Sequence, residues 1–266
     1  PILVMNSEKA SFQKLINNQL EPSVYSISFL ESFIKFLIKK GIKNYPIHLK
    51  IETGMNRLGF DSSDLNQLIE MILSQPEVTV KSVFSHLSSS DDQGEMEWTR
   101  SQMSKFDTAS NLLEDGLGYS ITRHLFNTNA ILNMNENPYE MVRLGLGLYG
   151  VSNPQDKNLE AVLKLKTKIT QIREIKKGES VGYSRKFKAP EKMRIGIIPI
   201  GYADGLMRNY SEKGDVFING KRAKIIGNIC MDMTIIDLTS IEASENDQVE
   251  IFGLNLNVIE VADKMN

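Results

Sequence analysis

The residues best suited to chemistry gather in one short stretch, His48 to Phe60, which reads HLKIETGMNRLGF. Successive side chains of a strand point to opposite faces, so the apolar residues here share one face and the titratable residues share the other. The titratable set is His48, Lys50 and Glu52. The following turn presents Arg57 beyond the carboxyl end of the strand, where ligands bind in parallel α/β folds. The stretch is therefore a candidate site, although a solvated strand face would give the same pattern.

The composition is that of a globular protein. The chain has 266 residues, of which 41% are hydrophobic and 24% are charged, and its net charge is -2. This balance gives no electrostatic case for binding nucleic acid, and no apolar run is long enough to span a bilayer. Cys230 is the only cysteine, so an intrachain disulfide is impossible, as suits a reducing compartment. We expect a cytoplasmic protein with one large domain or two smaller ones.

Strand-like and helix-like patterns alternate through residues 1–150. The predicted strands are 1–5, 23–28, 48–52, 80–87, 124–129 and 141–148. The predicted helices are 7–18, with Ser7 as its N-cap, 29–40, 64–74 and 95–114. This order is typical of a parallel sheet with right-handed crossovers. Six such strands fit either a doubly wound sheet or part of an eight-stranded barrel.

Residues 151–266 follow a different pattern. A polar linker is predicted at 152–156, and strands then succeed one another without a convincing amphipathic helix before 258–264. The predicted strands are 162–175, 194–200, 216–218 and 222–226. Asn219-Gly220 between the last two is a strong hairpin signal. We therefore predict a second, β-rich domain.

Several further side chains lie where barrel enzymes keep their sites. His86 ends a predicted strand, although a lone histidine there is more often structural. Arg143 falls on the last predicted strand of the first domain, where a buried arginine needs an acidic or ligand partner. The loops after the last two strands of a barrel commonly hold a phosphate, and Thr128 with the amides of Gly145 and Leu146 would be suitable donors. A phosphorylated cofactor is our hypothesis, although close barrel packing explains the glycines equally well. We expect no metal ion.

Seven segments together resemble, in order and spacing, the signature segments of bacterial alanine racemase. They are HLKIETGMNRLGF, FSHLSSSD, NTNAILN, MVRLGLGLYG, VGYSRKF, IPIGYADG and GNICMDMT. The resemblance covers nearly the whole chain. It implies a pyridoxal-phosphate enzyme of fold type III that has an α/β fold: a TIM (β/α)8-type barrel, six of whose eight strands are visible here, and then a C-terminal β-rich domain. The implied reaction interconverts L-alanine and D-alanine for peptidoglycan synthesis, through aldimine formation and two-base proton exchange.

The resemblance also implies roles for residues of the first domain, 1–150, which would bind pyridoxal 5'-phosphate (PLP). His86 would stack on the cofactor ring, Arg57 would hydrogen-bond near its phenolic oxygen, and Arg143 would face its pyridine nitrogen. The positions that match phosphate-binding residues are Thr128, Gly145 and Leu146. Lys50 matches a supporting lysine that family members often carbamylate, which would let it orient Arg57.

The second domain, 151–266, would contribute to the active site of the partner subunit in a head-to-tail homodimer. Tyr183 corresponds to the tyrosine that exchanges the substrate α-proton and would be the second catalytic base. Met231 and Asp232 correspond to residues that hold the substrate carboxylate. Tyr202 and Asp204 correspond to residues at the entrance of the same site.

One departure from the family pattern concerns the lysine that binds the cofactor covalently. In the family it ends a strand near the start of the barrel and precedes a loop of the Asn-Ala-Tyr-Gly-His-Gly type, and these 266 residues hold no such segment. We expect it upstream of Pro1, within two β/α units of about 30 residues each, with closing strands after Asn266. A fusion behind a cell-wall ligase would explain the missing start. We expect these residues alone to be inactive.

The sequence leaves two other functions open. A racemase of another amino acid, such as serine, would keep every residue named above. An inactive PLP-binding relative would keep the cofactor positions but would not need Tyr183 or Asp232. Both residues are present, and this favours the racemase.

Overall fold

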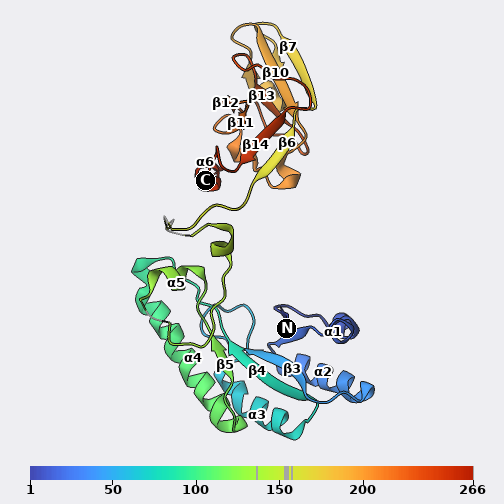
Figure 1. The fold of residues 1–266 in the computed structure, drawn as a ribbon, viewed down its shortest axis with the longest axis vertical. Coiled ribbons are helices and arrows are strands. Elements are labelled where there is room, and N and C mark those ends of the chain that lie inside the picture. The colour runs from blue at the N-terminus through green and yellow to red at the C-terminus, as the bar shows by residue number, and fades with distance from the viewer. Residues whose placement is uncertain (136, 153–155, 157, 266) are drawn as a thin grey trace. The chain divides into compact units, whose positions relative to one another are not determined.

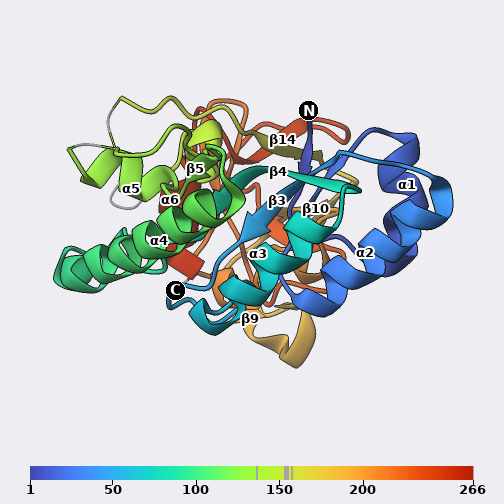
Figure 2. The same ribbon diagram turned by 90° about the horizontal axis from the view of Figure 1, so that it is seen from below.

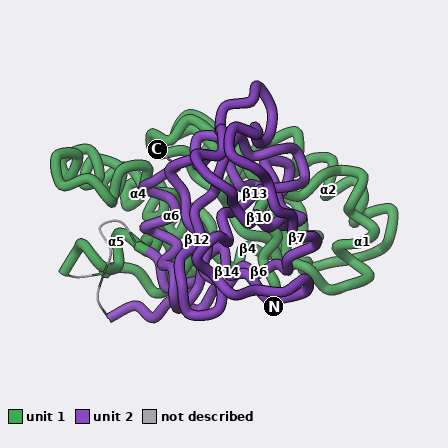
Figure 3. Tube along the Cα trace, turned by 90° about the horizontal axis from the view of Figure 1, so that it is seen from above, with its two compact units in different colours: residues 1–147, 152–156 green, residues 148–151, 157–266 purple. Residues whose placement is uncertain are grey.

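A computed structural model describes residues 1–135, 137–152, 156 and 158–265. The chain divides into two compact units, the first comprising Pro1–Gly147 with Ser152–Asp156, and the second Leu148–Val151 with Lys157–Asn266 (Figure 3). Each unit has a hydrophobic core of its own. The linker predicted at 152–156 falls largely outside the described residues.

The first unit is built on a five-stranded sheet in the order β1-β2-β3-β4-β5 (Figure 1). Its strands are β1 (Leu3–Val4), β2 (Glu21–Val24), β3 (Tyr45–Lys50), β4 (Val78–Phe84) and β5 (Thr122–His124). Every neighbouring pair is parallel. The parallel sheet predicted from the alternation of strands and helices is confirmed.

Helices connect these strands and cover one face of the sheet (Figure 2). They are α1 (Phe12–Asn17), α2 (Ile27–Lys40), α3 (Leu65–Ser74), α4 (Met96–Leu117) and, after β5, the short α5 (Thr128–Asn133). The short 3-10 helices of this unit are η1 (Lys9–Ser11), η2 (Ser62–Asp64) and η3 (Gln93–Glu95). The Ser26 hydroxyl caps α2 by accepting a hydrogen bond from the Phe29 amide, and Gly41, with φ 66°, ends it.

The alternation predicted for β3 is confirmed. Ile47 and Leu49 are fully buried in the core beneath the helices. His48 and Lys50 lie on the opposite face, and both are nearly buried there as well. The sheet therefore has a helix-covered apolar face and a second face that buries titratable side chains.

The sixth strand predicted for this unit, at 141–148, was wrong. Within the described residues of this segment, Met141 alone pairs with the sheet, through a parallel bridge to His124. Residues Leu146–Tyr149 form the 3-10 helix η4 instead. Glycines at 145 and 147 give a strand no side chains to pack, and Leu144 and Leu146 are 50% and 55% exposed. This segment therefore has little packing that would favour a strand.

Several helix boundaries also differ from the prediction. The Ser7 hydroxyl caps no helix and has no hydrogen-bond partner among the described residues. Thr128 does not end a strand; it begins α5, whose N-cap Asn127 accepts from the Ala130 amide at 3.0 Å. Helix α4 continues through Gly116, because this glycine packs against α3: a Cβ there would lie 2.6 Å from Ile69 Cδ1. The helix ends at Gly118, whose φ is 75°.

The second unit is β-rich, as predicted. Its sheets have the orders β13-β10-β7, β12-β11-β14-β6 and β8-β9, with antiparallel neighbours throughout. The strands are β6 (Leu165–Lys168), β7 (Gln171–Ile175), β8 (Ser180–Val181), β9 (Phe187–Lys188), β10 (Met193–Ile198), β11 (Asp215–Ile218), β12 (Lys221–Lys224), β13 (Thr234–Asp237) and β14 (Gln248–Phe252). The helices are η5 (Tyr183–Arg185), η6 (Tyr202–Asp204), η7 (Arg208–Tyr210) and α6 (Val258–Met265).

The predicted hairpin joins β11 to β12. Ile218 pairs with Lys221, so the connection has two residues, Asn219 and Gly220. Their φ angles are 45° and 80°, as the favoured two-residue hairpin turn requires. Among the described helices, none has the length and apolar content needed to cross a membrane.

Adjacent residues of α2 test the core of the first unit. Leu37 is fully buried, whereas Ile38 is 54% exposed. Leu37→Ala should lower the free energy of unfolding by about 2–5 kcal/mol, because it leaves a cavity in the core. Ile38→Ala should change it by about 0.5 kcal/mol or less. Trp98, the only tryptophan, lies in the first unit, so its emission during urea denaturation measures both values. Equal effects of the two substitutions would contradict this packing.

Candidate active site

A row of hydrogen-bonded polar side chains crosses the sheet on the face opposite the helices. It starts at Glu21 on β2, whose carboxylate lies 2.8 Å from His48 Nε2. His48 Nδ1 lies 2.6 Å from the Ser82 hydroxyl on β4, and that hydroxyl lies 2.8 Å from His124 Nε2 on β5. The row ends at Arg143, whose Nη1 is 2.9 Å from His124 Nδ1.

The arginine fixes the direction of every hydrogen bond in this row. A guanidinium only donates, so His124 Nδ1 must accept, and its Nε2–H must donate to Ser82. The Ser82 hydroxyl then donates its single proton to His48 Nδ1, and His48 Nε2–H donates to Glu21. Both histidines are neutral in this arrangement. Burial lowers the pKa of His124 to about 3, with a further contribution from the charge of Arg143.

Arg143 itself is held by acceptors that carry no full charge. Besides His124 Nδ1, its guanidinium donates to the carbonyl of His124 at 2.7 Å and to that of Ser85 at 2.5 Å. No ion pair joins Arg143 to a carboxylate in the described part of the chain. Burial lowers its pKa to about 10, so the group remains charged at neutral pH. Its half-buried charge therefore has no compensating carboxylate among the described side chains.

His86 follows the end of β4 and faces the same arginine. Its Nδ1 lies 3.4 Å from Arg143 Nη2. Burial, followed by the charges of Arg143, Arg57 and Lys50, lowers the pKa of His86 to about 4. The imidazole is therefore neutral at pH 7, and the three cations around it help to keep it so.

Lys50 is a second buried cation on this face. Only 5% of the residue is exposed. Its pKa is lowered by burial and then by Arg57 and Arg143, against a smaller opposing effect of Glu52. The Phe84 ring lies between the charges, with Lys50 Nζ 5.9 Å and Arg143 Cζ 5.2 Å from its centroid. Such contacts partly offset the desolvation of both groups.

Glu52, the third titratable residue of the opening stretch, has a structural role. Its carboxylate accepts hydrogen bonds from the amides of Gly54 and Arg57. Burial acts to raise the pKa of Glu52, but backbone amides of the turn, that of Asn56 foremost, outweigh it and lower the pKa. The carboxylate therefore fixes the turn that carries Arg57, whose own side chain is exposed beyond the end of β3.

Most of the predicted cofactor residues line one cavity of about 510 Å³ in the first unit. These are His86, Thr128, Arg143, Gly145 and Leu146; Arg57 lies outside this lining. The amides of Gly145 and Gly147 both donate to the Thr128 hydroxyl at 3.1 Å.

The two glycines beside Arg143 differ in why they lack a side chain. A Cβ at Gly147 would lie 2.9 Å from Thr128 Cγ2, so close packing accounts for that glycine. A Cβ at Gly145 would meet nothing within 4 Å. Packing therefore explains Gly147, whereas Gly145 leaves its backbone open to a ligand.

The predicted residues of the second unit gather on neighbouring loops. Asn228, in the loop after β12, donates from its side chain to the carbonyl of Tyr183 at 3.1 Å. The Tyr202 amide donates to the carbonyl of Cys230 at 3.0 Å. Gly201 permits this approach, because a Cβ there would lie 2.3 Å from the Cys230 oxygen. Asp204, also predicted here, accepts from the Gly201 amide and so caps η6.

The side chains these loops carry are largely open to solvent within this chain. Tyr183 is 65% exposed, Met231 58% and Tyr202 40%, and Asp232 is also exposed. Among the described residues, no three His, Cys, Asp or Glu side chains gather as metal ligands would.

Sequence reasoning missed Glu21, Ser82 and Phe84, which complete the site. Ser82 lies directly opposite His48 in the register of β3 and β4. That pairing is the signal that would have found it, but a register between parallel strands cannot be read from either strand alone.

A parallel sheet whose strands lead at their carboxyl ends into the site residues, followed by a β-rich unit, defines the class: an α/β-barrel protein with a C-terminal β domain. The family model for the alanine racemase N-terminal domain matches residues 1–153, and the model for the C-terminal domain matches residues 162–266. The chain belongs to the alanine racemase family.

Individual relatives of this chain are also alanine racemases. An alanine racemase of Clostridium perfringens is 35% identical over 262 residues, which cover 95% of this chain and 67% of the relative. The solved alanine racemase of Clostridium difficile has a TM-score of 0.87 at 28% identity, covering 100% of this chain and 71% of the other. The Bartonella henselae alanine racemase, solved with covalently bound pyridoxal phosphate, has a TM-score of 0.80 at 29% identity, covering 100% and 73%.

The depressed histidine pKa values predict how this site responds to pH. In the folded protein His86 and His124 should stay neutral at pH 5, whereas in the unfolded chain they titrate near 6.5. Because the unfolded state then binds more protons, their contribution to stability is present above pH 6.5 and is lost as the pH falls toward about 4. Histidine NMR titration measures the pKa values directly, since the chain has three histidines.

A matched pair of arginine substitutions tests whether Arg143 lowers the pKa values of His86 and His124. Arg143→Leu removes a positive charge and should raise the pKa of both His86 and His124. Arg123→Leu removes the arginine next to His124 in sequence, which is paired with Glu140, and should leave both pKa values unchanged. A folded wild-type protein in which His124 titrates near 6.5 would contradict the hydrogen-bond direction assigned here.

Proposed function

We propose that this protein is a PLP-dependent alanine racemase that interconverts L-alanine and D-alanine. The observation that carries the proposal is the cavity in which His86, Thr128, Arg143 and Gly145 meet, in a chain that belongs to the alanine racemase family. Its volume of about 510 Å³ lies within the range of cofactor sites.

The residues of this cavity fit PLP. Thr128 with the Gly145 and Leu146 amides would hold the phosphate, and the unpacked Gly145 leaves room for it. The neutral imidazole of His86 suits stacking on the ring. Arg143, whose half-buried charge has no carboxylate partner among the described residues, would face the ring nitrogen. When bound, PLP withdraws electrons from the substrate Cα and so makes the Cα proton acidic.

Arg143 limits how far that withdrawal goes. Its pKa of about 10 is lowered, yet it is still high enough that the guanidinium keeps its protons at neutral pH. Arg143 would therefore donate a hydrogen bond to the ring nitrogen and keep its proton. His124, which can only accept from Arg143, holds the guanidinium in place, and Ser82 and His48 hold His124.

Tyr183 is the residue to which we assign one of the two proton transfers, in the site of a partner subunit. A tyrosine can serve as a base where nearby cations stabilise its phenolate. The first unit supplies such cations in Arg57, Lys50 and Arg143, of which Arg143 lines the cavity. The exposure of Tyr183 within its own chain supports a role in a second subunit.

The other exposed residues of the second unit fit the same arrangement. Met231 and Asp232 would hold the substrate carboxylate, and Tyr202 would stand at the entrance. Their hydrogen-bonded loops present them together with Tyr183. A head-to-tail homodimer would bring this set to the PLP cavity of the partner and give each dimer two complete sites.

Lys50 is proposed to carry a carbamate. A neutral amine nitrogen attacks the carbon of CO2, forms a C–N bond and releases a proton, which leaves an anion. Burial and the neighbouring arginines lower the pKa of Lys50, so more of the amine is neutral and reactive. The resulting anion would pair with Arg57 and compensate positive charge that the described side chains leave uncompensated.

The racemisation assay that tests this function uses the natural full-length protein with PLP and a chiral measurement of the product. Alanine should racemise in both directions, and faster than serine. Tyr183→Phe should slow both directions by about 10²–10⁴-fold, the usual contribution of a positioned acid or base. Tyr119→Phe changes a tyrosine at the amino end of β5, whose hydroxyl accepts from the Val80 amide, and should leave the rate unchanged.

Each arm of this assay can contradict a separate part of the proposal. Equal rates for Tyr183→Phe and wild type would remove Tyr183 from the mechanism. Faster turnover of serine than of alanine would change the substrate. Retention of PLP without racemisation of any amino acid would make the protein a cofactor-binding relative.

The carbamate is tested by NMR with 13C-labelled bicarbonate. The wild-type protein should give one carbamate carbon signal that survives rapid removal of free bicarbonate. Lys50→Gln should lose it, because the amide nitrogen is not nucleophilic. Lys105→Gln, which removes a lysine that lies over the Trp98 ring, should keep it. A spectrum without that signal in the wild type, at saturating bicarbonate, would disprove the modification.

A further inference from the structure

Gln102 is a fully buried residue of α4 whose side-chain amide is used completely. Its Oε1 accepts from the Ser88 amide at 3.0 Å and from the Ser88 hydroxyl at 3.1 Å. Its Nε2 donates to the carbonyl of His86 at 3.2 Å and to the Thr53 hydroxyl at 3.4 Å. A carboxamide has two donors and two acceptor sites, so this side chain has no capacity left.

These partners belong to two separate loops that carry proposed cofactor residues. Thr53 starts the turn that leads from β3 to Arg57. His86 and Ser88 belong to the loop after β4. The loops also meet directly, because the hydroxyls of Thr53 and Ser85 lie 2.8 Å apart. One buried amide on α4 thus ties both loops to the same helix.

Two side chains, Arg143 and Gln102, form hydrogen bonds with the loop after β4. Arg143 binds the carbonyl of Ser85 and faces the His86 ring at 3.4 Å. Gln102 binds the next carbonyl, that of His86, and then Ser88. The backbone of His86 is therefore held by the glutamine, while its ring faces the arginine.

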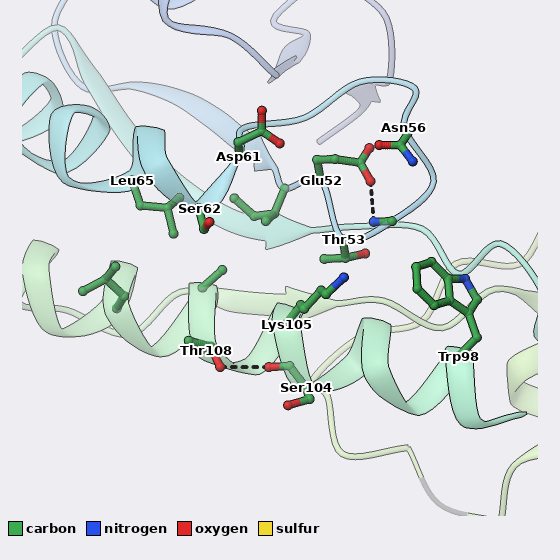
Figure 4. A pocket seen from close by; sticks show the side chains of 14 residues that line it. Glu52, Thr53, Asn56, Asp61, Ser62, Leu65, Trp98, Ser104, Lys105 and Thr108 are labelled. Atoms are coloured by element: carbon green, nitrogen blue, oxygen red, sulfur yellow. Dashed lines mark hydrogen bonds between the residues drawn. The ribbon is translucent and has the colours of Figure 1, made fainter.

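Trp98, one helical turn before Gln102, supports the same contact. Its Nε1 donates to the Ser88 hydroxyl at 3.0 Å. Its ring lies so close to Gly54 that a Cβ there would be 2.5 Å from Trp98 Cζ2. Figure 4 shows Trp98 on its helix beside the turn that carries Thr53, with Glu52 directed toward the Gly54 amide.

The turn and α4 also enclose a cavity beside Trp98. A cavity of about 520 Å³ is lined by Glu52, Gly54 and Asn56 of the turn and by Trp98 and Lys105 of α4. Beside this cavity, the Trp98 ring against Gly54 and the hydrogen bonds of Gln102 connect the turn to the helix.

We propose that Gln102 is a positioning residue that sets the place of His86 relative to the Arg57 turn, and thereby the fit of both to PLP. The inference rests on the proposed function for the identity of the ligand, but the contact it describes exists without the ligand. Replacing Gln102 by an apolar residue leaves the Ser88 amide and the His86 carbonyl without their partner, and such buried groups shift toward any other partner they can reach.

The test compares Gln102→Met, which keeps the length of the side chain, with Thr99→Val on the same helix. Thr99 is also fully buried, but its hydroxyl has no partner among the described residues. Gln102→Met should displace the His86 NMR signal of the PLP-free protein at neutral pH, and should weaken PLP binding in equilibrium dialysis by about tenfold. Thr99→Val should change neither. Circular dichroism confirms that each variant is folded.

The outcomes separate this inference from the proposed function. A folded Gln102→Met protein with an unmoved His86 signal and unchanged PLP affinity would overturn the role of Gln102, whether or not the protein racemises alanine. If the wild type binds no PLP, the proposed function fails, and the His86 signal alone decides on Gln102. Should Gln102→Met fail to fold, Gln102→Asn, which keeps the amide one methylene nearer the helix, gives the same readouts with the same expected displacement.

Discussion

The half-buried charge of Arg143, which no carboxylate in the described structure pairs with, is the constraint on which the rest of the site depends. Placing a cation in a protein interior is costly unless hydrogen bonds satisfy it, and a carboxylate would be the simplest partner. The described structure supplies carbonyls and neutral imidazoles instead. These acceptors satisfy the N–H groups but leave the charge itself uncompensated. The site is thereby kept electropositive, as a site for a phosphorylated and electron-rich ligand should be.

Because Arg143 donates to His124, the histidines of the row are neutral. The register of the sheet makes this arrangement possible. His48 and His124 lie on strands separated by β4, too far apart to bond directly, and the Ser82 hydroxyl between them accepts from one and donates to the other. The parallel register that sets Ser82 opposite His48 is therefore part of the electrostatics of the site. A fold that paired these strands one residue out of step would turn the row of side chains to the opposite face.

Local patterns in the sequence were sufficient for most of the fold. The alternation in β3, the helices at 29–40 and 64–74 and the Asn219-Gly220 turn each depend on neighbouring residues alone, and each prediction is confirmed. Segment 141–148 alternates like a strand, yet a strand also needs neighbours, and its two glycines and exposed leucines gain little from pairing. The helix predicted over 95–114 stops short of Gly116 because nothing in that segment indicates that Ile69 of α3 packs against this glycine.

In the site, too, features that depend on local sequence were predicted, and features that depend on distant partners were not. Residue types and motif order were enough to select His86, Arg143 and Thr128, which the structure brings to one cavity. Glu21, Ser82 and Gln102 have ordinary sequence surroundings, and they act through partners 14 to 49 positions away. Such partners become visible only when the register of the strands and the rotation of α4 about its own axis are known.

The separation of the two cores bears on how the chain is synthesised. The members of the first core lie between Phe12 and Tyr139, and those of the second between Ile169 and Val261. Each of these cores consists of residues from one unit. The first core is therefore free to assemble while the ribosome is still adding the strands of the second, and the apolar surface exposed on the nascent chain at any moment is limited to one core at a time.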